Sequence, residues 1–323
     1  MLRNNKKIVA LLCAVVMTSS IFIGCSSNNE AKKDGNNAAQ EQKQENKKEE
    51  DKKETAKEYI NKDYIVDADW LKENIDNKDV VIVDCRESKD YKKGHIKNAI
   101  NIVWKDLSND ENNVLDAEAL SKKLSEFGLA KDKTIVLYGV KGSWGEDGRV
   151  QWTLRYAGLE NAKMLNGGFD LWQSKEYETS KEEVKPTAAE VKVDSFKEDL
   201  NITTEHLKEN LGKVKIIDTR EKDEYEGATK YGEARGGHLP GAININFSTL
   251  YNEDGTLKSQ DEIEKIMTDN GINKEDEIVT YCTSGIRSGH MAMVLRLAGY
   301  NNAKNYDASY VAWAGTPDLE VEK

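Results

Sequence analysis

The sequence predicts an α/β protein built from two similar domains, each a parallel sheet with helices on both faces. Three observations support this fold class. The chain has 323 residues, which is enough for two domains of ordinary size. Its second half repeats motifs of its first half in the same order, and short apolar runs alternate with helical stretches in both halves.

The repeat is seen as pairs of stretches that match in order along the chain. Each half opens in a similar way, continues with a strand and an Asp-x-Arg type sequence, and closes with a second strand, a helix and an aromatic-rich end. We therefore predict domains at 64–175 and 198–323, joined by a charged linker at 176–197 that contains Pro186. The matched stretches are 67–75 with 203–211, 80–102 with 214–245, and 134–172 with 277–313.

Short continuous apolar runs predict the buried parallel strands. These runs are Val80–Val83, Ile135–Leu137, Val214–Ile217 and Ile278–Tyr281. A helix is predicted over 288–299, where Met291, Val294, Leu295 and Ala298 form one apolar stripe and Gly299 ends the helix.

The first 25 residues have the pattern of an export signal rather than of a folded domain. Basic residues (Arg3, Lys6 and Lys7) precede an apolar stretch, and "FIGC" resembles the lipobox of bacterial lipoproteins. That resemblance implies lipidation of Cys25 and a protein anchored to the outer face of the cell membrane. An uncleaved membrane anchor is the alternative, and it also places the domains outside the cytoplasm.

Residues 26–60 are rich in Asn, Gln, Lys and Glu, and they contain almost no apolar side chains. Such a composition cannot bury enough surface to offset the entropy of ordering, so we predict a disordered polar tether. The formal net charge of the whole chain is −11, which argues against a nucleic-acid partner.

Only two cysteines, Cys85 and Cys282, lie in the predicted domains. Two widely spaced cysteines do not form a disulfide framework, although a single bridge between them is an open alternative. Cys282 directly follows a predicted strand and precedes "TSGIR", so it lies at the carboxyl edge of the sheet, where α/β proteins keep their ligand sites.

The turn after Cys282 combines three features that favour a thiolate. Its backbone N–H groups can curl toward the sulfur around Gly285, the following helix begins with partial positive charge, and Arg287 adds a full charge. Cys282 is therefore predicted to be a nucleophile. A buried core cysteine is the alternative, but it explains neither Gly285 nor Arg287.

These motifs resemble those of the rhodanese family, and in particular of tandem-domain sulfurtransferases. "YCTSGIRSGH" is similar to the family's active-site loop, "IIDTRE" and "GGHLPGAIN" to its second motif, and "NYDASYVAW" to its third. The resemblance implies a persulfide on Cys282, bound by the loop Thr283, Ser284, Gly285, Ile286 and Arg287. It also implies a small-molecule sulfur donor, a thiol or cyanide as acceptor, and no cofactor. The four scattered histidines predict no metal site.

The loop length bears on the substrate. Related dual-specificity phosphatases have five residues between Cys and Arg, whereas this loop has four, which favours sulfur over phosphate. Arg287 favours thiosulfate, a dianion that a guanidinium can bind through two N–H donors. The family's second basic residue is absent from the acidic stretch 221–227, and Arg235 is the candidate replacement, with an exposed loop charge as its alternative.

Other functions stay open at this stage. These are a 3-mercaptopyruvate sulfurtransferase, a surface carrier or redox sensor of sulfane sulfur that does not turn over, and a pure binding module. The sequence identifies neither the natural donor and acceptor nor a partner protein.

The first half is predicted to have lost the chemistry. Gly139 stands opposite Cys282 in the repeat, and the longer loop that follows contains no cysteine. Cys85 is expected to pack in the core, with a resolving or sulfur-accepting thiol as the alternative. Asp218, Arg220 and His238 have counterparts in this half, so a supporting structural role is predicted for them.

Overall fold

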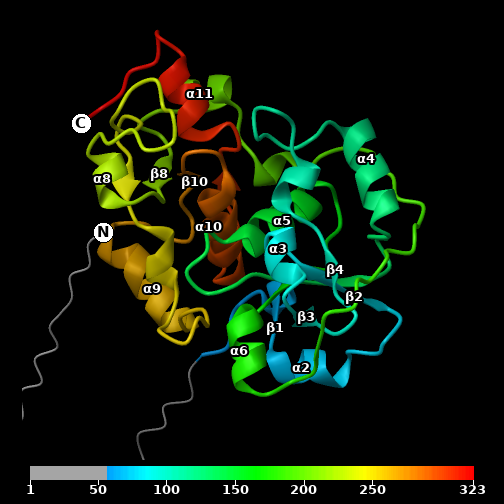
Figure 1. The fold of residues 1–323 in the computed structure, drawn as a ribbon. Helices are drawn as coiled ribbons and strands as arrows, with labels where there is room; N and C mark the ends of the chain where they lie inside the picture. The colour runs from blue at the N-terminus through cyan, green and yellow to red at the C-terminus, as the bar shows by residue number, and fades with distance from the viewer. Residues whose placement is uncertain (1–56) are drawn as a thin grey trace, which may run out of the picture. The chain divides into compact units, whose positions relative to one another are not determined.

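A computed structural model describes residues 57–323, which form one compact unit (Figure 1). The predicted signal segment with Cys25 and residues 26–56 of the predicted tether lie outside the described residues. Within the described part of the chain, no helix is both long enough and apolar enough to cross a membrane.

The first half contains a parallel sheet in the spatial order β1-β6-β5-β2-β4. Its strands are β1 (Ile65–Val66), β2 (Val80–Asp84), β4 (Ile100–Asn101), β5 (Thr134–Tyr138) and β6 (Ala162–Leu165). Its helices are η1 (Lys62–Tyr64), α2 (Ala68–Glu73), α3 (Ser88–Tyr91), η2 (Trp104–Leu107), α4 (Ala117–Glu126), α5 (Glu146–Tyr156) and α6 (Gly168–Ser174).

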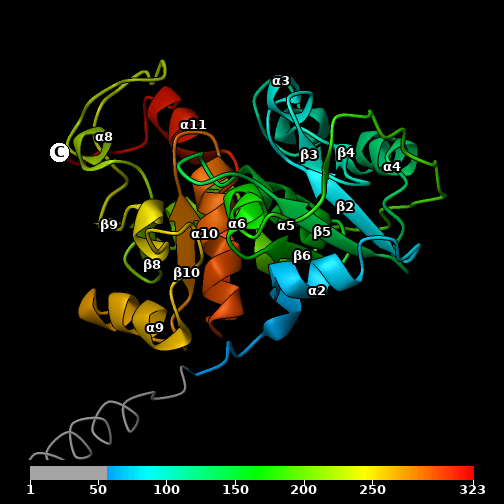
Figure 2. The same ribbon diagram turned by 60° about the horizontal axis from the view of Figure 1, so that its bottom comes forward.

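The second half repeats this arrangement in the order β11-β10-β8-β9, again with parallel strands (Figure 2). Its strands are β8 (Lys215–Asp218), β9 (Ile243–Asn244), β10 (Ile278–Tyr281) and β11 (Ala303–Asn305). Its helices are η3 (Glu198–Leu200), α7 (Thr204–Glu209), α8 (Lys222–Tyr225), η4 (Phe247–Leu250), α9 (Gln260–Asp269), α10 (Ile286–Leu297) and α11 (Ser309–Gly315).

Both faces of each sheet are covered, as predicted. Along β5, Ile135 and Leu137 pack into one core cluster with α4 and α5, while Val136 and Tyr138 pack into another with α2 and α6. Alternate residues of a strand point to opposite faces, so an all-apolar run requires a helix layer on each side. The apolar runs of the sequence identified these strands to within about one residue.

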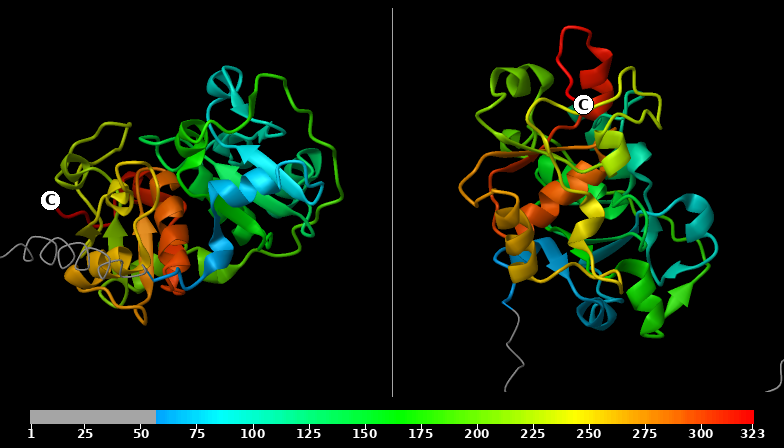
Figure 3. Two further views of the ribbon diagram at one scale, coloured as in Figure 1. Left: turned by 90° about the horizontal axis from the view of Figure 1, so that it is seen from below. Right: turned by 90° about the vertical axis from the view of Figure 1, so that its left-hand side faces the viewer.

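The helix predicted at 288–299 is α10, which begins at Ile286 and ends at Leu297. Gly299 has φ 90°, the left-handed conformation that closes a helix. The four residues of the predicted stripe are buried in one core cluster, but the other faces of α10 are buried too. The far side of α10 packs against α5 of the first half, and Figures 1 and 3 show the two helices side by side between the sheets.

Two further segments pack against the halves. The predicted linker contains β7 (Thr179–Ser180), which pairs antiparallel with β3 (His95–Ile96), and its Val193 is buried in the core of the first half. At the start of the described chain, the Asn61 N–H donates to the carbonyl of Leu297, 3.0 Å away. The chain ahead of the first half therefore packs on the second half.

Candidate active site

Cys282 lies in a four-residue turn between β10 and α10. Gly285 makes this turn possible, because its φ of 80° is left-handed and because a Cβ there would lie 2.8 Å from Asp307 Oδ1. The Cys282 N–H donates to Ser309 Oγ at 3.1 Å, and its carbonyl accepts from the Tyr310 N–H at 3.0 Å. The start of α11 thus fixes the backbone of the cysteine.

The Cys282 residue is 2% exposed, and the groups around its sulfur stabilise a thiolate. Burial alone would raise the pKa of this thiol. The charge of Arg287 opposes that effect, and so do hydrogen bonds from Ser288 and from the Ser284 N–H. The balance holds the pKa of Cys282 below its ordinary value, as expected of a nucleophilic cysteine.

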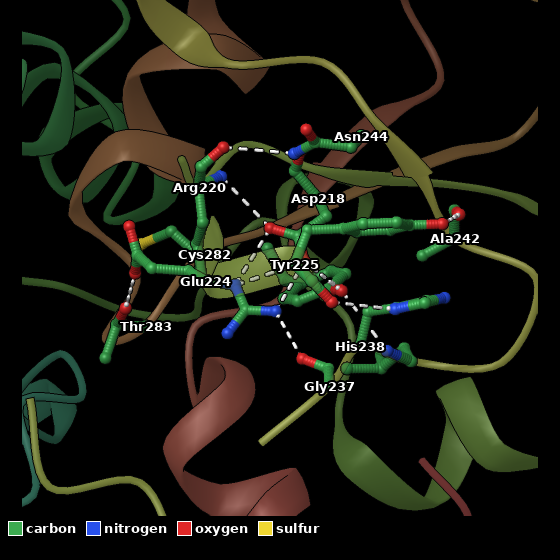
Figure 4. Close-up of polar contacts among 12 residues, drawn as sticks. Asp218, Arg220, Glu224, Tyr225, Gly237, His238, Ala242, Asn244, Cys282 and Thr283 are labelled. Atoms are coloured by element: carbon green, nitrogen blue, oxygen red, sulfur yellow. Dashed lines mark hydrogen bonds and ion pairs between the residues drawn. The ribbon is translucent and has the colours of Figure 1, made fainter. Parts of the chain in front are cut away.

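Arg287 makes a buried ion pair that the sequence analysis missed. Its two terminal nitrogens donate to the Glu224 carboxylate at 2.7 and 2.9 Å, and Nη2 also donates to Thr283 Oγ1 at 2.8 Å. Figure 4 shows Glu224 and Thr283 beside Cys282. Burial tends to raise the pKa of Glu224, but its bonds to Arg287 lower the pKa below its usual value. Arg287 is therefore shared between a thiol and a carboxylate.

The signal for Glu224 was present in the acidic stretch 221–227. A single sequence shows that this stretch is acidic, but it does not show which of the acidic side chains points into the protein. Ile286 also differs from its expected place at the sulfur, since its side chain packs with the core of the first half.

Asp218 and Arg220 form a tie beneath the turn. Arg220 pairs with Asp218 at 2.6 Å and donates to the Gly237 carbonyl at 2.7 Å (Figure 4). The Tyr281 hydroxyl also donates to Asp218, at 2.5 Å. His238 stacks on Tyr225, with the ring centroids 3.7 Å apart.

The first half contains the same tie, although the loop that follows its strand β5 has no cysteine. Arg86 pairs with Asp84 at 2.5 Å, Tyr138 donates to Asp84, and His95 stacks on Tyr91. The Asp–Arg pair and the stacked histidine occur in both halves, whereas the Cys282 turn occurs in one. This recurrence favours a structural role for them.

The chain is similar in sequence to a known family and to named proteins of that family. The family model described as "Rhodanese-like domain" matches residues 67–175 and 203–316. A "Thiosulfate sulfurtransferase" of Corynebacterium glutamicum is 31% identical over 281 residues, which cover 82% of this chain and 92% of that protein. A "Putative thiosulfate sulfurtransferase" of Mycolicibacterium smegmatis is 32% identical and covers 80% of this chain and 98% of its own length.

This chain is a tandem rhodanese sulfurtransferase. Among solved structures, an anaerobic ergothioneine biosynthesis enzyme from Chlorobium limicola superimposes with a TM-score of 0.77 at 24% identity. The match covers 82% of this rhodanese and 71% of that chain. At this identity the likeness speaks for the fold alone.

Arg235 of the rhodanese binds the backbone at the end of α11 and just after it. Its guanidinium donates to four backbone carbonyls, so the hydrogen-bonding capacity of this side chain is largely taken up within the protein. The carbonyls belong to Trp313, Ala314, Thr316 and Leu319. These bonds favour a structural role for Arg235 over the predicted contact with substrate.

Exposed apolar side chains gather around the Cys282 turn. Trp144 from the first half and Tyr231 from the second meet edge to face at 5.5 Å, and the Arg287 guanidinium lies 5.9 Å from each ring. Val311, whose N–H donates to the Thr283 carbonyl, is also exposed. An acceptor approaching Cys282 would meet an aromatic and apolar rim.

The first half also contributes to the turn from within the molecule. The Arg149 guanidinium of α5 forms a buried ion pair with Asp307 and donates to the Gly285 carbonyl at 3.3 Å. Because Gly285 shapes the Cys282 turn, the first half helps to hold that turn of the second half in place.

Cys85 and Cys282 are both free thiols, so the alternative of a disulfide between them is wrong in this structure. Cys85 is buried, and burial together with the nearby carboxylates raises its pKa well above the ordinary value. These surroundings favour the predicted packing role. Across residues 57–323, no group of three or more potential ligands could hold a metal ion.

Proposed function

We propose that this rhodanese transfers sulfane sulfur through a persulfide on Cys282. The observation that carries the proposal is the Cys282 turn itself, in which backbone N–H groups and Arg287 surround a thiol of lowered pKa. The same groups are suited to holding the negative charge of a persulfide, which extends one sulfur farther than a thiolate.

The reaction has two steps. The Cys282 thiolate attacks the outer sulfur of thiosulfate, the sulfur–sulfur bond of the donor breaks, and sulfite leaves with the electron pair. A thiolate or cyanide then attacks the outer sulfur of the persulfide, and Cys282 leaves as a thiolate again. No external oxidant or reductant is needed, and the loop supports an anion on Cys282 at both ends of the cycle.

Thiosulfate is the proposed donor because the relatives that match most of the chain are named for it. Arg287 supports this donor less than its sequence position indicated, since Glu224 already occupies two of its N–H donors. Among the alternatives, 3-mercaptopyruvate carries a single carboxylate and would need less positive charge at the loop.

The cellular place of the reaction is also a proposal. The basic and apolar N-terminus with its "FIGC" sequence supports lipidation of Cys25 and an enzyme tethered outside the cytoplasm. Labelling cells with a radioactive fatty acid would test this, with Cys25→Ala as the variant that should lose the label.

The test of function is steady-state formation of thiocyanate from cyanide, with thiosulfate and 3-mercaptopyruvate compared in parallel. Wild-type protein should turn over with thiosulfate, and Cys282→Ser should lose at least about a thousandfold because the nucleophile is gone. Cys85→Ser is the matched control and should keep its turnover. Undiminished activity of Cys282→Ser would refute the mechanism. A single burst of sulfur release would favour the carrier.

A further inference from the structure

A cavity of about 290 Å³ lies beside the loop of the first half that replaces the cysteine loop. Its walls come from both halves, and no residue of 282–287 lines it. Glycines 139, 142, 145, 167 and 168 belong to the lining and form its glycine wall. This space is separate from the Cys282 turn and is not used by the proposed sulfur transfer.

The polar end of the cavity is formed by a carboxylate in the place of the lost thiol. Gly139 follows β5 as Cys282 follows β10, and a Cβ on Gly139 would lie 3.3 Å from the Asp147 carboxyl carbon. Asp147 Oδ1 accepts the Gly148 N–H at 2.9 Å. The anion position of this loop is therefore already filled by the chain itself, which excludes a second anion.

His290 of α10 lines the cavity and has one ring nitrogen without a partner among the described residues. The residue is 1% exposed, and its Nε2 lies 2.8 Å from the Tyr251 hydroxyl, on whose ring it stacks. Within residues 57–323 its Nδ1 has no hydrogen-bond partner, and it lies 3.8 Å from Asp147 Oδ1, which is too far for a hydrogen bond. A buried nitrogen of this kind is normally satisfied, so it points to a bound polar group.

The rest of the lining is mostly apolar, and no lysine or arginine of residues 57–323 forms an ion pair with Asp147. Ile65, Met164, Leu165 and Leu257 contribute aliphatic surface. The one lysine of the lining, Lys141, donates its ammonium to the backbone carbonyl of Glu253. A carboxylate in apolar surroundings attracts a positive charge more strongly than one in water.

We propose that this cavity, the Asp147 cavity, binds a small organic cation whose ammonium or amidinium lies between Asp147 and His290. Its apolar body would fill the space between the glycine wall and the aliphatic side chains. The site goes beyond the proposed sulfur transfer, because no residue of the Cys282 turn lines it.

The test measures, by isothermal titration calorimetry on the purified protein, the affinity of three probes of similar size. The probes are benzylamine, benzyl alcohol and benzoate, which carry a positive charge, no charge and a negative charge. Benzylamine should bind at least about tenfold more tightly than benzyl alcohol, which is about 1.4 kcal/mol, and benzoate should bind weakest. Equal affinity for benzylamine and benzoate, or no binding of benzylamine, would overturn the proposal.

Variants then locate the site. Asp147→Asn should reduce benzylamine binding to the level of benzyl alcohol, whereas Glu146→Gln, an equivalent change one residue earlier and outside the lining, should not. Ser248→Phe adds a ring to the lining and should block all three probes even if Asp147→Asn folds poorly. Cys282→Ser should bind benzylamine as wild type does. Unchanged binding in both Asp147→Asn and Ser248→Phe would place the cation elsewhere and refute the site.

Discussion

At the scale of single residues, the reactivity of Cys282 depends on how Arg287 divides its charge. The guanidinium faces the sulfur and is also held by Glu224 through two hydrogen bonds. Glu224 orients Arg287, but its negative charge also weakens the stabilisation of the thiolate. The two side chains should therefore act on the thiol pKa in opposite directions.

We predict that Arg287→Gln raises the pKa of Cys282 and that Glu224→Gln lowers it further. The wild-type pKa is already below the ordinary value, so loss of the cation removes the main attraction and loss of the carboxylate strengthens it. The rate of alkylation by iodoacetamide as a function of pH measures this. A shift of one pKa unit changes the thiolate fraction below the pKa by about tenfold.

Arg287→Lys is the control that keeps the positive charge but lacks the planar guanidinium. In this variant the pKa of Cys282 should stay closer to its wild-type value than in Arg287→Gln. If both neutral variants shifted the titration in the same direction, the division of charge between sulfur and carboxylate would be disproved.

At the scale of elements, α5 joins the halves through its close backbone approach to α10 and through one buried ion pair with the segment that follows β11. A Cβ on Gly148 would lie 2.7 Å from the His290 Cα, so the crossing requires a glycine. Next to it, Arg149 reaches Asp307 and Gly285. A side chain of the first half therefore helps to hold the Cys282 turn of the second half in place.

We predict that Arg149→Met destabilises the protein by roughly 3–5 kcal/mol, because it leaves Asp307 buried without its cation. Urea unfolding measures the change. The double variant Arg149→Met with Asp307→Asn should recover part of the loss, since the unpaired charge is then gone. Lys265→Ala removes an exposed ion pair within α9 and should have little effect. Stability of Arg149→Met equal to wild type would contradict this account.

At the scale of the whole molecule, the interface between the halves buries a histidine that should make stability depend on pH. Burial lowers the pKa of His290 from 6.5 to about 4. Below pH 6.5 the unfolded chain binds a proton there and the folded chain does not, so folding loses stability as the pH falls toward 4.

We predict that, between pH 7 and pH 5, the free energy of unfolding of the wild type falls by about 2 kcal/mol relative to that of His290→Gln. Asp147, whose pKa burial raises to about 6, titrates over the same range in the opposite sense. It is present in both proteins, so the comparison largely cancels its contribution. Urea unfolding at the two pH values measures the difference, and parallel pH profiles would show that His290 titrates as it does in water.

Much of the fold could be read from the sequence because local patterns carry it. The apolar runs gave β2, β5, β8 and β10, since a strand buried on both faces must be apolar throughout. The internal repeat gave two halves of the same architecture. Gly285 and the four-residue turn indicated the loop at Cys282, because a left-handed residue between strand and helix is a local requirement.

Pairings between distant segments were decided only by the tertiary structure. Glu224 lies 63 residues from Arg287 in sequence, and nothing local marks it as the inward-facing acid of its stretch. The burial of all of α10 likewise depends on α5, which lies in the other half. The sequence by itself determined the elements, the duplication and the position of the thiol. The partners of Arg287, the support from Arg149 and the Asp147 cavity arise where the halves and loops meet, and contacts across that distance leave no periodic pattern in the chain.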